Sequence, residues 1–300
     1  MMQKSIEEKA LIVTIIVNTI ITGAGIWVFL ATKMNALFLD CFFSFVALVS
    51  TIFAAIISKN SKKTTNHYPH GIYFLEPLYA ILKSLLTLSL LVVAAVSAGE
   101  SAFEYWVTGN GIVMNTAPVL PYALSMTVLC LGLSFYNSRQ NKRINGVSTM
   151  LSAEAKTNFI DGLQSFGVGI GILLLGAVDI NSSLGFLHYT GDFFVTTILV
   201  LFSIKEPIQV LQSAFRELSG GTVCDRKIQN AVSETLKKYF HDDTAIENYE
   251  IYKIGMKIKV QIYFAVDRIA NKQKELNNFR EQARRELLQQ YENIEIVYLF

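Results

Sequence analysis

Residues 36–58 read ALFLDCFFSFVALVSTIFAAIIS, an apolar run with one charged side chain, Asp40. A helix needs about 20 predominantly apolar residues to cross the hydrocarbon core of a bilayer. Further stretches of this kind lie near residues 10–31, 76–98, 117–136, 150–178 and 190–213. The sequence therefore predicts six membrane-spanning helices, the first two joined by a short link into a helical hairpin.

The composition also indicates a membrane protein. Hydrophobic residues make up 52% of the 300-residue chain and charged residues 17%, whereas soluble domains carry roughly 25% charge. Residues 1–220 hold 13 Lys or Arg and 12 Asp or Glu, and residues 221–300 hold the same numbers. This uneven distribution predicts a membrane domain over residues 1–213, a connector over 214–224 and a small soluble domain over 225–300. A net charge of +2 gives no argument for nucleic-acid binding, and the three dispersed cysteines form no metal-binding motif.

Basic residues predict how the chain is oriented. One set of helix flanks carries ten Lys or Arg residues, and the opposite loops carry only Lys33. The positive-inside rule places the basic flanks in the cytoplasm, so both termini are expected to be cytoplasmic. The short loops favour an integral protein of a bacterial inner membrane. The ten basic residues are Lys4, Lys9, Lys59, Lys62, Lys63, Arg139, Lys142, Arg143, Lys205 and Arg216.

The last part of the chain predicts a small mixed domain. Helical spacing of apolar residues covers 225–240 and 271–291, and strand-like runs cover 246–253, 256–266 and 294–300. In the second run Ile258, Val260, Ile262 and Phe264 alternate with polar or amphipathic residues, the pattern of a half-buried strand. The order αββαβ predicts an α+β sandwich with helices on one face of a sheet.

Two acidic residues are expected inside the spans, Asp40 in the second and Asp161 in the fifth. A charge near the middle of a bilayer costs about 2.5–3.5 kcal/mol, so such residues suggest a function. Ser44 lies one turn after Asp40, and Thr157 one turn before Asp161, so each pair shares a helix face. Converging carboxylate and hydroxyl oxygens suit a hard divalent cation, although such groups also serve as simple helix–helix hydrogen bonds. Lys83 is expected to extend its ammonium group to the interface.

Several local motifs add to this pattern, in order along the chain. They are ALFLD ending at Asp40, Glu76-Pro77-Leu78, Asp161 followed by Ser165-Phe166-Gly167-Val168, Glu206-Pro207, and Phe215-Arg216-Glu217-Leu218-Ser219. With six spans and an αββαβ domain, the chain resembles the cation diffusion facilitator family of divalent-metal transporters. The resemblance covers nearly the whole chain.

The resemblance implies metal efflux by metal/proton antiport through a site between the second and fifth spans. The site residues would be Asp40, Ser44, Thr157 and Asp161, with no tightly bound cofactor, and the cytoplasmic domain would form a homodimer. The family usually has an acidic residue where Ser44 stands and His or Asp where Thr157 stands, so half of the charged ligands are missing. Oxygen ligands alone favour manganese or ferrous iron over zinc, which prefers nitrogen and sulfur.

The missing ligands keep a second hypothesis open, a non-transporting or regulatory subunit that partners an active homologous transporter. A membrane enzyme finds no support, because the sequence has no nucleophile–base constellation and no phosphate-binding glycine loop. His67 and His70 lie where the family often has metal-binding histidines, but they are shifted from the matching positions. His241 with Asp242 and Asp243 is read as a polar turn at a helix end.

Overall fold

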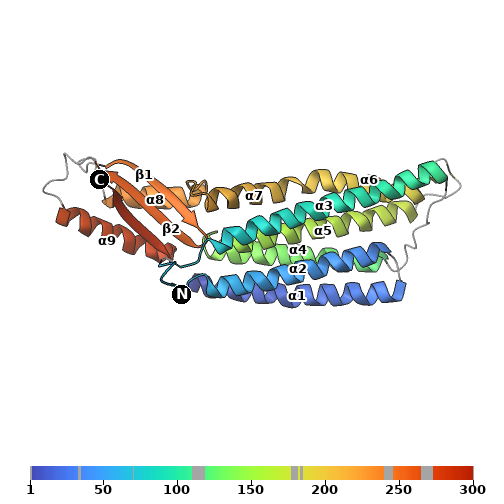
Figure 1. Ribbon diagram of the computed structural model, residues 1–300, viewed down its shortest axis with the longest axis horizontal. Coiled ribbons are helices and arrows are strands. Elements are labelled where there is room, and N and C mark those ends of the chain that lie inside the picture. The colour runs from blue at the N-terminus through green and yellow to red at the C-terminus, as the bar shows by residue number, and fades with distance from the viewer. Residues whose placement is uncertain are drawn as a thin grey trace.

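The computed structural model describes residues 2–32, 35–69, 71–109, 119–176, 182, 185–239, 246–264 and 273–299. The molecule is elongated, with a helical bundle along most of its length and a small sheet-containing domain at one end (Figure 1). We call this small domain the terminal domain and the adjoining end of the bundle the domain end. The first turn of α1 also lies at the domain end (Figure 1).

The bundle helices correspond to the six predicted apolar stretches. In the part of the chain that the structure describes, four helices are long and apolar enough to cross a membrane, and residues 44–60 form a shorter apolar helix. The prediction of a multi-pass helical membrane domain followed by a small α+β domain is confirmed. The bundle consists of α1 (Met2–Thr32), α2 (Asn35–Asn60), α3 (Leu75–Thr108), α4 (Val119–Arg143), α5 (Thr149–Gly176), α6 (Leu187–Ser203) and α7 (Lys205–Leu218).

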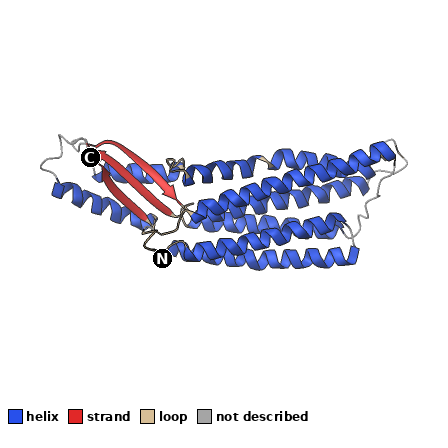
Figure 2. Cartoon of the chain, in the orientation of Figure 1, coloured by secondary structure: helices blue, strands red, loops and turns tan. Residues whose placement is uncertain are grey.

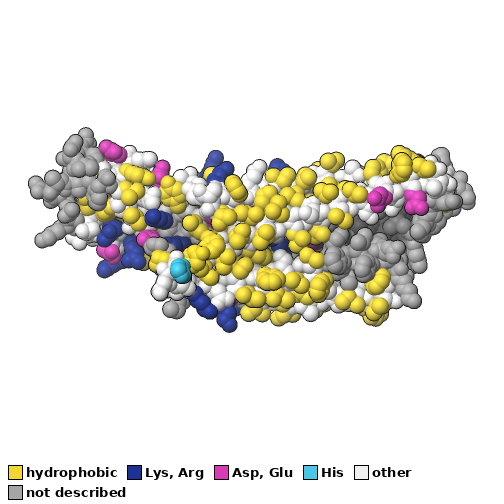
Figure 3. All heavy atoms as spheres, viewed as in Figure 1, with side chains coloured by type: hydrophobic (Ala, Val, Ile, Leu, Met, Phe, Trp, Pro, Cys, Tyr) yellow, Lys and Arg dark blue, Asp and Glu magenta, His cyan; other side chains and the backbone are white. Residues whose placement is uncertain are grey.

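The outer surface of the bundle is largely apolar. A broad hydrophobic area covers the middle of the face shown in Figure 3, whereas Lys and Arg side chains gather nearer the terminal domain. Large side chains such as Trp27, Phe103 and Phe202 are more than two-thirds exposed. Exposed apolar area on this scale is unfavourable in water, and it fits helices whose backbone polar groups are satisfied internally and whose side chains face lipid.

The last predicted span is divided in two by a proline. The predicted stretch near 190–213 is divided into α6 and α7 at Ile204, just before Pro207 in the first turn of α7. Proline has no backbone N–H and so removes one helical hydrogen bond. Ile204 keeps helical dihedral angles and its N–H still bonds to the Val200 carbonyl, so α7 continues in nearly the direction of α6 (Figure 1).

The terminal domain has the predicted order of elements. Its three-stranded sheet has β2 in the middle, antiparallel to β1 and parallel to β3, and Figure 2 shows α8 and α9 beside it. Side chains alternate along β2, and those at 258, 260, 262 and 264 are buried against apolar residues of both helices. The elements are α8 (Arg226–Tyr239), β1 (Ile246–Ile254), β2 (Lys257–Phe264), α9 (Gln273–Gln290) and β3 (Ile294–Leu299).

A small polar group links the first two strands of this sheet. The hydroxyls of Tyr252 and Tyr263 donate hydrogen bonds of 2.5 and 2.9 Å to the Glu250 carboxylate. These two bonds favour the charged form and hold the pKa of Glu250 below its ordinary value.

The terminal domain and the bundle share one hydrophobic core. A single cluster of buried apolar side chains includes Leu11 of α1, Leu151 of α5 and Ile258 of β2. The β1–β2 turn lies against the start of α3, where a Cβ on Gly255 would come within 2.7 Å of the Tyr73 carbonyl oxygen. The φ of Gly255 is +59°, in the left-handed region that glycine adopts readily.

Candidate functional site

The structure places the four predicted site residues on two helices of the bundle. Ser44 belongs to α2, and Thr157 and Asp161 belong to α5; all three side chains are partly buried. Asp40 precedes Ser44 on α2, but its side chain lies outside the described part of the structure. Among the described residues, no group of three or more His, Cys, Asp or Glu side chains could hold a metal ion.

One buried hydrogen bond links α2 and α5. The Thr51 hydroxyl of α2 donates to Oε2 of Glu154 on α5 over 3.1 Å, and both residues are fully buried. Seven residues make two helical turns, about 10.5 Å, and return to nearly the same face. Because the two helices are antiparallel (Figure 1), seven residues away from the domain end lead from Thr51 to Ser44 and from Glu154 to Asp161. This register places Ser44 and Asp161 at the same level of the bundle.

Glu154 is the centre of a buried polar network that we call the Glu154 cluster, formed with Asn18, Thr51, Tyr79 and Lys83. The Lys83 ammonium lies 2.9 Å from Oε1 of Glu154, and the Tyr79 hydroxyl also donates to Oε1. The Asn18 amide of α1 donates to the Thr51 hydroxyl over 3.2 Å. Four helices, α1, α2, α3 and α5, are thereby joined around one carboxylate.

The prediction that Lys83 extends its ammonium group to the membrane interface is wrong. Its side chain is 3% exposed and forms an ion pair with a fully buried Glu154, rather than extending to the interface. A lysine in an apolar helix reaches inward when a buried carboxylate is available, because an unpaired buried charge is far more costly than a paired one. Sequence reasoning also missed Glu154, although it stands two turns before Asp161 and so shares its helix face.

Asn158 lies on α5 between Glu154 and Asp161. Its side chain is 4% exposed, and its amide nitrogen has no hydrogen-bond partner among the described residues. Buried polar groups are nearly always hydrogen-bonded, so this amide marks a place where a further polar group belongs. Ser165, one turn beyond Asp161, donates instead to the Asp161 backbone carbonyl over 3.0 Å.

A second buried network, the junction cluster, lies at the domain end and consists of Lys4, Glu7, Ser58, Glu76 and Ser148. The Lys4 ammonium pairs with Glu7 and lies 2.7 Å from Oε1 of Glu76. The Ser58 hydroxyl donates to Glu7 over 2.5 Å, and Ser148 donates to the other Glu7 oxygen. Lys4 was expected to be a flanking basic residue, yet it is 2% exposed. This cluster joins α1, α2, α3 and the start of α5 beneath the terminal domain.

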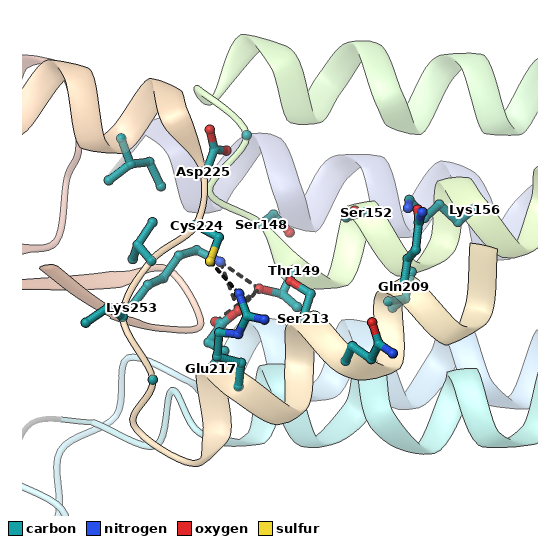
Figure 4. A pocket seen from close by; sticks show the side chains of 18 residues that line it. Ser148, Thr149, Ser152, Lys156, Gln209, Ser213, Glu217, Cys224, Asp225 and Lys253 are labelled. Atoms are coloured by element: carbon teal, nitrogen blue, oxygen red, sulfur yellow. Dashed lines mark hydrogen bonds and ion pairs between the residues drawn. The ribbon is translucent and has the colours of Figure 1, made fainter. Parts of the chain in front are cut away.

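A polar cavity of about 370 Å³ opens where α5 and α7 meet the terminal domain. Figure 4 shows Lys253 of β1 reaching towards Thr149 and Glu217 at this point, with distances of 2.8 and 3.2 Å. Arg216 contacts the Cys224 sulfur. The charged side chains that line the cavity are mixed in sign, and Lys253 and Glu217 form an ion pair, so the cavity indicates no particular ligand.

Of the three histidines considered as metal ligands, His67 is the one that the structure describes. His67 is exposed. His70 and His241, with Asp242 and Asp243, lie outside the described residues.

A search of curated proteins finds no match to the chain. A family model described as the cation efflux transmembrane domain matches residues 11–219, which is more than half of the chain and runs from α1 to the end of α7. The chain therefore belongs to the cation efflux family, the cation diffusion facilitators, whose members move metal cations across membranes.

Proposed function

We propose that this protein exports a divalent metal cation from the cytoplasm in exchange for protons, through a site between α2 and α5. Asp40 and Asp161 supply the charge, and Ser44 and Thr157 supply neutral oxygens. The observation that carries the proposal is the Thr51–Glu154 hydrogen bond, because the register that it defines brings Ser44 level with Asp161.

The ligand set favours a hard ion. Every proposed ligand is an oxygen atom, and carboxylate and hydroxyl oxygens suit manganese and ferrous iron better than zinc, which prefers imidazole and thiolate. Manganese or iron is therefore the proposed cargo. The ion is a substrate that binds and leaves, and no resident cofactor is required.

Proton exchange follows from the chemistry of two neighbouring carboxylates. Like charges in a poorly solvated site repel each other, so the metal-free pair is able to hold a proton that a binding divalent ion displaces. Alternating exposure of the site to the two sides then couples outward metal movement to inward proton movement. The basic flanks favour a cytoplasmic terminal domain, and this domain is the proposed homodimer contact. A bacterial inner membrane is the proposed location.

The test is transport by the purified protein alone in sealed vesicles, with manganese, ferrous iron, zinc and cobalt supplied in turn on the terminal-domain side. We expect metal-dependent proton movement with manganese or iron, and its loss in Asp40→Ala and Asp161→Asn. Glu104→Gln is the matched control. It removes an exposed carboxylate of α3, far from the proposed site between α2 and α5, and the variant should transport normally.

Wild-type flux in Asp40→Ala would contradict the site assignment. No flux with any of the four ions would favour the second hypothesis, a regulatory partner of an active homologue, which the neutral Ser44 and Thr157 support.

A further inference from the structure

We propose that Glu154 is an additional cation-binding residue, which forms an intermediate binding site between the domain end and the level of Asp161. When no metal ion is present, the Lys83 ammonium occupies this site by pairing with Glu154. This inference rests on the proposed function, because it assigns a second binding site on the same transport pathway. Glu154 is not among the four residues that the sequence singled out.

The position of Glu154 supports this role. It stands two turns, about 10.5 Å, from Asp161 along α5 and on nearly the same face. Across from it, Thr51 stands two turns from Ser44 along α2. A cation that travels between α2 and α5 from the domain end therefore reaches the Glu154 level before the Asp161 level.

The atoms around Glu154 suit a hard cation. Both carboxylate oxygens accept hydrogen bonds, and the neighbouring hydroxyls of Thr51 and Tyr79 bring further oxygen atoms within contact of the carboxylate. The Ser50 hydroxyl lies 3.3 Å from the Tyr79 hydroxyl. Divalent manganese, magnesium and calcium bind such sets of carboxylate and neutral oxygens.

Asn158 supplies an independent indication of a ligand. It follows Glu154 by one helical turn, towards Asp161. Its buried amide nitrogen has no hydrogen-bond partner among the described residues. An asparagine side chain offers a carbonyl oxygen as well as an NH2 group, and rotation about its last bond exchanges them. The oxygen of a water molecule that accompanies a passing ion would accept a hydrogen bond from the amide nitrogen, and after rotation the carbonyl oxygen would face the ion.

Lys83 explains why the position stays neutral without a metal ion. The Lys83 and Glu154 side chains are 3% and 0% exposed, and a carboxylate alone in such a place is strongly destabilising. The lysine ammonium is a compact charge on a flexible four-carbon chain. It is therefore able to leave Glu154 when a divalent ion arrives. In this arrangement Lys83 competes with the metal ion and weakens its binding.

The experiment measures binding of Mn²⁺ alone to the purified full-length protein, with the free ion followed by its electron paramagnetic resonance signal. All variants carry Asp161→Asn, so the α2–α5 site is disabled and transport is not the readout. Adding Lys83→Met should increase Mn²⁺ affinity at least tenfold, because the competing cation is gone. Adding Glu154→Gln as well should abolish that gain.

Lys156→Met is the matched control. Lys156 lies on α5, as Glu154 does, and pairs with Glu206 over 2.8 Å. Both side chains of this pair are about one-third exposed, so removal of the Lys156 charge should leave Mn²⁺ affinity unchanged. Lys83→Gln, which keeps a hydrogen-bond donor near Glu154, replaces Lys83→Met if that variant does not fold. No gain with either variant, or a gain that survives Glu154→Gln, would overturn the inference. Because these measurements are independent of flux, failure of the transport test would leave their result interpretable.

Discussion

Lys4 forms ion pairs with both buried carboxylates of the junction cluster. Glu7 and Glu76 are both fully buried, and the Lys4 ammonium contacts one oxygen of each. Substitution Lys4→Met keeps the length and most of the apolar volume of the side chain but removes its charge. Two carboxylates then face each other without a counter-charge, in a place that water does not reach.

Breaking a buried ion pair by removing one partner costs about 3–5 kcal/mol. At about 2 °C per kcal/mol for a chain of this size, the apparent Tm should fall by roughly 6–10 °C. The assay is thermal unfolding of the detergent-solubilised protein at neutral pH, followed by helical circular dichroism. Lys62→Met is the matched control, because Lys62 pairs with Glu292 over 3.6 Å at the same end of the molecule and is 37% exposed. Such exposed pairs contribute less than about 1 kcal/mol.

A double substitution separates loss of charge from loss of packing. In Lys4→Met/Glu76→Gln only Glu7 stays charged, and it keeps its hydrogen bonds from Ser58 and Ser148. We expect the double variant to be more stable than the sum of the two single effects, by about 1–3 kcal/mol. Additive effects, or a Tm change in Lys4→Met no larger than in Lys62→Met, would refute the reasoning.

Three further predictions concern other parts of the molecule. Gly255→Ala should lower the Tm more than Gly220→Ala, because both glycines have positive φ but only the first lacks room for a Cβ, and the left-handed conformation alone costs about 1–2 kcal/mol. The lowered pKa of Glu250 means that its stabilising contribution is complete above about pH 4.3 and is lost as the pH falls through the lowered value, so Glu250→Gln should flatten the decline of Tm in acid. Thr51→Val should cost about 1–2 kcal/mol and reduce metal flux, because the hydrogen bond that sets the α2–α5 register is lost; unchanged flux would contradict this role.

The regular elements were predictable because their patterns are local. Alternation along residues 257–264 identified β2 and its buried face, and the apolar runs identified the bundle helices. The break at Ile204 was not predicted. The apolar run continues past that residue, and the effect of Pro207 on the local hydrogen bonds is visible only in the backbone.

The buried charges were the least predictable feature. Lys83 and Glu154 are 71 residues apart in sequence, and each lies near a helix end, where a charge ordinarily reaches water. Whether such a side chain points outward or inward depends on which helix lies opposite, and one sequence does not contain that information. Asp161 was singled out from the sequence because it stands further from the helix end, and its role in the site stays a prediction.

At the domain end, the start of α1 is hydrogen-bonded to the end of α9 and to the segment between α9 and β3. The Gln3 backbone and side chain form hydrogen bonds of 2.8, 2.7 and 3.0 Å with residues 290 and 292, at the end of α9 and just beyond it. The first turn of α1 is therefore attached to the terminal domain as well as to the bundle. In the proposed alternating exposure of the site, a movement of α1 must either carry the terminal domain along or break these three hydrogen bonds. A shift of the terminal domain, in turn, pulls directly on the helix that holds Asn18 against the Glu154 cluster.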